Sequence, residues 1–236
     1  CLQEFIVSSD NANKTGLITE KEFNKIMSDY PYRSIIRLGE KKSKNLYGLA
    51  VYSKYPIQKA GEIPIDSPYN GAAIYELKIG KKIVTLVNNH LESNRITAED
   101  KVLYGKFIKT DEKGKMLDVV SQNIQERLGT AYRVREYQAN IISQYIQKRD
   151  SLSFGTIVCG DFNDVPNSFT YHQIKGNMID AYANTGFGPG ITFHENHFWF
   201  RIDFIFHSLG FQSYNCTVDK VKYSDHYPVW TYLQIK

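Results

Sequence analysis

Short polar side chains follow apolar, strand-like runs at several points in this chain, and together such groups can activate a water molecule. The most compact case is TIVCGDFNDVP at 156–166, where an apolar run reaches Gly160 and then presents Asp161 and Asn163. A buried strand that ends this way places polar groups at the rim of a sheet, where a rigid scaffold meets a loop. Asp and Asn after a glycine also form ordinary turns, so this stretch alone leaves both interpretations open.

The same pattern recurs along the sequence. Acids, histidines or amides end or interrupt five β-type segments: Gln3-Glu4, Asn89-His90, Asp161 to Asn163, Asp203, and Asp225-His226. Together these segments hold four carboxylates and two imidazoles. Carboxylate and amide oxygens suit Mg²⁺ or Mn²⁺, so the sequence predicts a hard-metal, water-activating site.

Asp203 and His226 form a natural pair in this interpretation. Asp203 lies in the apolar run 201–208, and burying a carboxylate without a partner is costly. His226 follows Asp225 in a segment that we expect to be a bent loop, where both side chains can point one way. Asp203 could then hold the tautomer of His226.

Zinc is not expected. His194 and His197 are too close together for a helical zinc pair, and the surrounding aromatic stretch 193–200 is strand-like. We interpret that stretch as a wall of the site or as ordinary packing. Cysteines occur only at positions 1, 159 and 216, which is neither a disulfide framework nor a zinc pattern.

The composition is that of an ordinary soluble globular protein. The 236 residues are 42% hydrophobic and 23% charged, which favours a single domain spanning 1–236. The net charge of +4 tolerates a phosphate-bearing ligand without demanding nucleic acid. No apolar run approaches the ~18 residues of a membrane span, and there is no signal-peptide pattern.

Local signals place the elements that must position these groups. Thr19 and Glu22 form a capping box for a helix that should reach about Tyr30. From Met116 onward a helical repeat appears, which Gly129 should break or kink, and we expect Arg133 and Arg135 to be solvated. The other expected elements are strands at 33–39, 45–57, 201–208, 211–218 and 228–235, a loop or edge strand at 58–71, a hairpin of 72–80 with 81–93 that turns at Gly80, and a short helix capped by Ser168.

The motifs resemble the endonuclease/exonuclease/phosphatase superfamily. The resemblance rests on QE at 3–4, NHLES at 89–93, GDFND at 160–164, RIDFIF at 201–206 and SDHYP at 224–228, and it covers nearly the whole chain. Its members include deoxyribonuclease I-like nucleases, abasic-site endonucleases, sphingomyelinases and inositol polyphosphate phosphatases. The sequence as a whole, including GLAVYSKYPI at 48–57, is similar to that of uncharacterised bacterial members.

The resemblance implies an α+β fold, a four-layer α/β/β/α sandwich of two mostly antiparallel sheets flanked by helices. It also implies hydrolysis of a phosphate ester with Mg²⁺ or Mn²⁺. The implied roles are Glu4 and Asp225 at the metal, His226 as general base or transition-state stabiliser oriented by Asp203, Asp161 for the attacking water, Asn163 on a phosphate oxygen or on Asp161, Asn89 on the substrate, and His90 at the phosphate and leaving group.

One departure concerns the first strand. The family carries an Asn there, and this chain starts with Cys1-Leu2, which we interpret as the end of the second strand. We therefore expect a piece that lacks the first strand, with any membrane anchor or export signal upstream of Cys1. His90 favours the deoxyribonuclease- and sphingomyelinase-like branches over abasic-site repair.

One alternative function stays open on the sequence. The chain could be a binding module that keeps the fold without the catalysis, since one fold hosts many functions. No sequence feature indicates an obligate protein partner or a structural role. The polar segment 94–115 is long for a connection, so we expect it to be functional or mobile.

Overall fold

The computed structural model describes residues 1–9, 16–40, 42–94, 114–150, 152–195 and 198–236, with only the backbone for 114–125 and 150. The elements in chain order are β1 (Leu2–Ser8), α1 (Glu20–Ile26), β2 (Tyr32–Leu38), β3 (Asn45–Ser53), β4 (Ile57–Ile63), β5 (Gly71–Ile79), β6 (Lys82–His90), α3 (Gly114–Asp150), β7 (Gly155–Asp161), α4 (Phe169–Lys175), β8 (Ile179–Asp180), α5 (Ala181–Thr185), β9 (Phe193–Glu195), β10 (Phe198–Phe200), β11 (Asp203–His207), β12 (Phe211–Val218) and β13 (Val229–Ile235).

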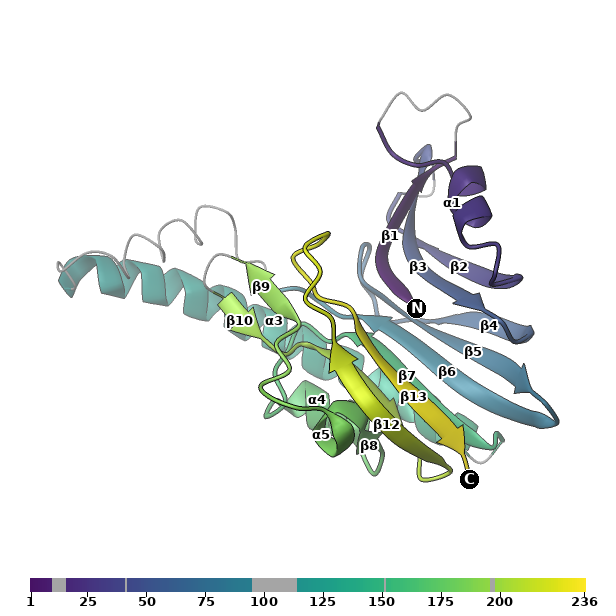
Figure 1. Cartoon of the computed structure of the whole chain (residues 1–236). Helices are drawn as coiled ribbons and strands as arrows, with labels where there is room; N and C mark the ends of the chain where they lie inside the picture. The colour runs from purple at the N-terminus through teal and green to yellow at the C-terminus, as the bar shows by residue number, and fades with distance from the viewer. Residues whose placement is uncertain (10–15, 41, 95–113, 151, 196–197) are drawn as a thin grey trace.

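A six-stranded sheet in the order β4-β5-β6-β7-β11-β8 carries the site (Figure 1). Only β6 and β7 pair in parallel, and the chain between them includes α3, as a parallel crossover requires. The register places His90 opposite Asp161, and β11 places Asp203 on the other side of Asp161. Three of the predicted site residues therefore form one row across three neighbouring strands.

The layers are those of the expected α/β/β/α sandwich, which confirms the predicted fold class. One face of the large sheet packs on α3 and α4 through Ile142 and Ile174, which are fully or almost fully buried. The other face packs on β2 and β3 through Leu49 and Leu86. Helix α1 covers the outside of the β1-β3-β2 sheet, with Phe23 against Phe5 and Tyr52 (Figure 1).

The second sheet layer is in two pieces, β1-β3-β2 and β12-β13. A groove lies between the edges of β1 and β13, and its lining includes Leu2, Ile157, Cys159, Ile205 and Leu233. The expectation that a strand is missing before Cys1 stays a prediction.

Several local predictions are confirmed. Thr19 and Glu22 form the full capping box, and Ser168 caps α4. Gly80, at a φ of 59°, makes the turn between β5 and β6. The edge-strand interpretation of 58–71 holds for β4, which lies at one end of the large sheet.

Four expectations were wrong. Cys1-Leu2 is not the end of a strand, because β1 continues to Ser8. Helix α1 ends at Ile26, before Tyr30. Gly129 does not divide α3, since a single glycine costs a helix only about 1 kcal/mol and packing overrides it. Arg135 is fully buried, whereas Arg133 is exposed as expected.

Most of the polar segment 94–115 lies outside the described residues, so the prediction about its role stays a prediction. Within the described part of the chain, no helix combines the length and hydrophobicity needed to cross a bilayer.

Candidate active site

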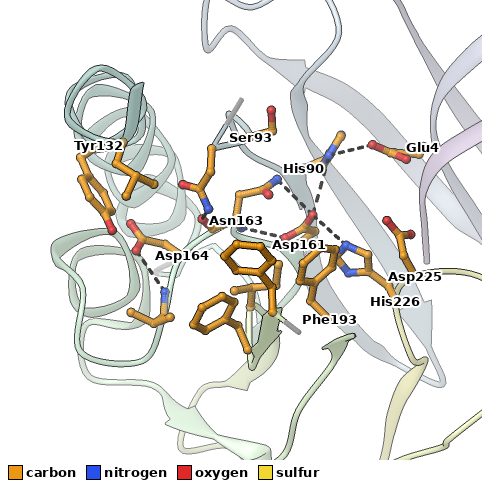
Figure 2. Close-up of a pocket in the computed structure, with 16 residues that line it drawn as sticks. Glu4, His90, Ser93, Tyr132, Asp161, Asn163, Asp164, Phe193, Asp225 and His226 are labelled. Carbon is orange, nitrogen blue, oxygen red and sulfur yellow. Dashed lines mark hydrogen bonds and ion pairs between the residues drawn. The ribbon is translucent and has the colours of Figure 1, made fainter. Parts of the chain in front are cut away.

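The row of strand ends opens into a pocket of about 330 Å³ (Figure 2). Its polar side consists of groups from β1, from the ends of β6 and β7, and from the loop before β13. These are Glu4, His90, Asp161, Asn163, Asp225 and His226, with Ser93, Asn94 and Asp164 beside them. Six of the eight predicted site residues therefore line one cavity, although they come from four distant parts of the sequence.

The turn after β7 fixes Asp161. Gly160 has a φ of 139°, and a Cβ there would lie 2.0 Å from the carbonyl oxygen of Asn89, so only glycine allows this close approach of β6 and β7. Asn163 has a left-handed φ of 52°. Its backbone amide donates to Asp161 Oδ1 at 2.7 Å, and its Nδ2 donates to Asp161 Oδ2 and to the Leu91 carbonyl, both at 3.0 Å. Both hydrogens of Nδ2 are thus engaged, which favours orientation of Asp161 over phosphate binding by this amide.

His226 is held by Asp203. Asp203 Oδ2 lies 2.9 Å from His226 Nδ1, which supplies the partner that its apolar surroundings require. Asp203 begins β11 and does not itself line the pocket. The pairing leaves Nε2 of His226 toward the cavity, 3.9 Å from Asp161 Oδ2.

His90 lies on the other side of the same carboxylate. Its Nε2 is 3.8 Å from Asp161 Oδ2 and 3.5 Å from Glu4 Oε1 (Figure 2). Asp161 Oδ2 therefore faces two imidazole nitrogens at distances too long for direct hydrogen bonds. A polar gap of this size suits a bridging water.

Glu4 reaches the pocket through a β-bulge. The register of β1 with β3 shifts between Leu2 and Phe5, and Glu4 has a φ of 48°. A bulge inserts one extra residue and turns its side chain away from the regular alternation. Phe5 and Val7 then face the buried side under α1, while the Glu4 side chain remains 69% exposed at the cavity.

Asn89 is not placed as a substrate contact. It is fully buried and does not line the pocket, because successive side chains of a strand point to opposite faces and His90 occupies the pocket face. Neither amide atom of Asn89 has a hydrogen-bond partner among the described residues.

A model of the Endonuclease/Exonuclease/phosphatase family matches residues 1–226. The chain belongs to this family. Its members are hydrolases that act on phosphate esters. A search of curated proteins finds no significant match.

Solved structures of the same family share the fold. An endonuclease/exonuclease/phosphatase from Bacteroides vulgatus is 20% identical at a TM-score of 0.59, over 93% of this chain and 82% of its own. A mannosyl-6-phosphatase from Bacteroides thetaiotaomicron is 17% identical at a TM-score of 0.60, over 91% and 82%. Beta toxin from Staphylococcus aureus is 18% identical at a TM-score of 0.57, over 91% and 83%. Identities this low establish the fold alone.

Burial and neighbouring charges shift the pKa values of His226, Asp161 and His90 in different directions. Burial lowers the pKa of His226, but the hydrogen bond and charge of Asp203, with Asp161 and Asp225, outweigh it and raise the pKa to about 9. Burial and the charge of Asp203 raise the pKa of Asp161 well above its usual range. Burial lowers the pKa of His90, although the charge of Glu4 opposes this. Near neutral pH, His226 is therefore cationic, His90 is neutral, and Asp161 is a stronger base than a solvated carboxylate.

The donor set fits a hard divalent cation. Asp161, Asp203 and His226 bring ligand atoms within 4.8 Å of one another, but His226 Nδ1 and Asp203 Oδ2 are already engaged with each other. Glu4 and Asp225 are exposed carboxylates on the same side of the pocket (Figure 2). Mg²⁺ is usually held by one or two carboxylates together with waters and substrate phosphate, which is what these two residues offer.

The opposite half of the pocket is apolar. Leu128, Tyr132, Val165, Phe193, Phe198, Phe200 and Ile202 line it. Phe193, Phe198 and Phe200 thus give the described part of the aromatic stretch one of the two roles expected for it, a wall of the site. Leu128 and Tyr132 were missed, since Leu128 belongs to a helical repeat that indicates core packing and no sequence signal singles out Tyr132.

Proposed function

We propose that this family member hydrolyses phosphate esters in a divalent-metal-dependent reaction with an activated water. The supporting observation is the row of His90, Asp161 and Asp203 across three strands, with His226 hydrogen-bonded to Asp203. Two exposed carboxylates, Glu4 and Asp225, line the same pocket as His90, Asp161 and His226. Hydrolysis of bis(p-nitrophenyl) phosphate, with Mg²⁺ or Mn²⁺ added to metal-stripped protein, tests the proposal. A protein that folds but hydrolyses neither this diester nor p-nitrophenyl phosphate, with either metal, would instead be a binding module.

Asp161 is assigned to the water. Asn163 fixes the carboxylate through two hydrogen bonds, and Oδ2 faces the gap between the two imidazoles. A water in this gap is within reach of a carboxylate whose pKa is raised well above its usual range by burial and by Asp203, which favours proton transfer.

His226 is assigned to the charge that develops on the phosphate. With a pKa of about 9 it is imidazolium at neutral pH, so of its two expected roles the stabiliser is favoured over the general base. His90, neutral and 4% exposed, is assigned to a hydrogen bond with the phosphate or leaving group.

Glu4 and Asp225 are assigned to the metal. When bound, Mg²⁺ or Mn²⁺ would neutralise phosphate charge and polarise the phosphoryl oxygen. The bulge that turns Glu4 into the pocket supports this role, because unusual backbone conformations cluster at functional sites.

Glu4→Gln should raise the Mg²⁺ concentration for half-maximal activity by at least about 10-fold, the lower end of the effect of outer-shell partners. The change removes a charged oxygen donor and keeps the shape. Activity titrated with Mg²⁺ measures the effect, with Glu62→Gln on β4 as the exposed control. Identical titrations for Glu4→Gln and the parent would remove Glu4 from the metal site.

The apolar half of the pocket favours esters with a compact, ring-bearing substituent next to the reacting phosphate. Phe200→Ala should lower kcat/KM for thymidine p-nitrophenyl phosphate by about 10-fold, the effect of losing ~1.5 kcal/mol of apolar burial. Methyl p-nitrophenyl phosphate has the same leaving group and no nucleoside, so it should lose much less. Phe169→Ala, on an exposed residue of α4, is the matched control. An equal loss for both substrates would contradict the assignment.

A further inference from the structure

The proposed chemistry leaves one large buried charge without a role. Arg135, on α3, has no exposed surface, which is rare for an arginine. Its Nε donates to Asp164 Oδ2 at 3.2 Å, and its Nη1 donates to the carbonyl oxygen of Glu92 at 2.8 Å. Arg135 does not line the catalytic pocket, so any effect on the reaction passes through its two hydrogen-bond partners or through the ring of Tyr132, which lies 4.8 Å from its Cζ and lines the pocket.

The two partners lie on the segments that carry the catalytic groups. Glu92 follows His90 at the end of β6, and Asp164 follows Asn163 in the turn after β7. Gln138, one helical turn from Arg135, accepts from the Glu92 amide at 3.0 Å. Helix α3 thus holds the end of β6 through both the amide and the carbonyl of one residue.

The same segments are tied to each other inside the site. The amide of Leu91 donates to the carbonyl of Asp161 at 3.0 Å, and Asn163 Nδ2 donates to the Leu91 carbonyl. Arg135 connects the two segments a third time, from α3, and holds Asp164, the residue after the left-handed turn at Asn163. The separation of His90 from Asp161 is therefore set jointly by strand pairing and by this guanidinium.

Stability alone does not account for Arg135. A buried ion pair is often no more stabilising than apolar residues of similar volume. What an arginine supplies is a rigid fork whose nitrogens address two acceptors in fixed directions, which a lysine cannot do.

We propose that Arg135 is a positioning residue that sets the geometry between the 90–94 and 161–165 segments, and so the alignment of His90 with Asp161. The catalytic part of this inference rests on the proposed function. Arg135→Met keeps the length of the side chain and removes both hydrogen bonds. The matched control is Arg133→Met, two residues away on the exposed face of the same helix.

The test combines kinetics, melting and hydrogen exchange on the whole chain. Arg135→Met should lower kcat by about 10- to 100-fold, since misplacement by ~1 Å can cost 10²-fold, and leave the Mg²⁺ titration unchanged. Amide exchange in 161–165 should become faster. In Arg135→Met with Asp164→Asn, the melting temperature should recover because no charge is left unpaired, while Asn keeps the size of the side chain and the oxygen that accepts from the Val165 amide. Neither kcat nor the exchange rate should recover. The loss of kcat in the double variant should not exceed the loss in whichever single variant loses more.

A purely structural role gives a different result. In that case kcat and exchange follow the melting temperature back to the parent values in the double variant, or Arg135→Met leaves kcat unchanged. If the parent hydrolyses no phosphate ester, the proposed function fails by itself. The exchange comparison then still decides whether Arg135 fixes the 161–165 segment, and equal exchange in Arg135→Met and the parent would overturn the inference.

Discussion

Replacing His226 with alanine is expected to lower kcat/KM for a phosphodiester by about 10²–10⁴-fold, the usual contribution of a group that assists proton transfer or stabilises charge. The Nε2 of this imidazole lies 3.9 Å from Asp161 Oδ2, and the hydrogen bond to Asp203 at Nδ1 keeps Nε2 toward the cavity. Initial rates with saturating Mg²⁺ measure the loss.

The control for His226→Ala is His172→Ala. His172 is exposed on α4 and does not line the catalytic pocket, so its removal should leave the rate unchanged. If His226→Ala keeps the parent rate while circular dichroism shows the same fold, the imidazole has no catalytic role.

Asp161→Asn is expected to abolish activity to a similar extent without destabilising the fold. The change keeps the size of the side chain and removes the base. Ionised Asp161 is unfavourable in its buried position beside Asp203, as its raised pKa shows. A carboxyl whose pKa is raised on folding destabilises the folded state once it is ionised, so a neutral amide should relieve that cost at neutral pH.

The measurement for Asp161→Asn is the melting temperature alongside kcat. We expect a melting temperature close to that of the parent, because relief of the buried charge offsets the acceptor that Asn163 loses, together with a kcat loss of about 10²-fold or more. Asp29→Asn, on an exposed residue after α1, is the matched control. A variant that melts much lower, or one that retains its rate, would argue that Asp161 is a structural turn residue, the interpretation that the sequence alone left open.

The strand ends and their polar groups could be predicted from the sequence because they depend on local patterns. An apolar run followed by glycine and short polar residues predicts the end of β7 and the polar groups after it, whatever the tertiary contacts of the rest of the chain. The pairing of Asp203 with His226 was also predictable, since a carboxylate in an apolar strand must find a partner. The two-residue period of a strand also predicts that Asn89 and His90 point to opposite faces, and only His90 lines the pocket.

Other features depend on contacts that no local pattern encodes. Arg135 lies off the apolar repeat of its helix, so the sequence predicts a solvated side chain; its partners Asp164 and the Glu92 carbonyl are distant in sequence. Glu4 is delivered by a bulge, which is visible only in the pairing of β1 with β3. Gly129 fails to break α3, since tertiary packing outweighs a penalty of about 1 kcal/mol.

We expect a water oriented by Asp161 to attack the phosphorus of an ester when a divalent cation is bound in the pocket. Hydrolysis of bis(p-nitrophenyl) phosphate in water labelled with a heavy oxygen isotope, followed by mass spectrometry, tests this most directly. We predict one labelled oxygen in the phosphate product, formed only when Mg²⁺ or Mn²⁺ is present and at background levels with Asp161→Asn. Label in the released p-nitrophenol, or equal product formation by metal-stripped protein, would contradict it.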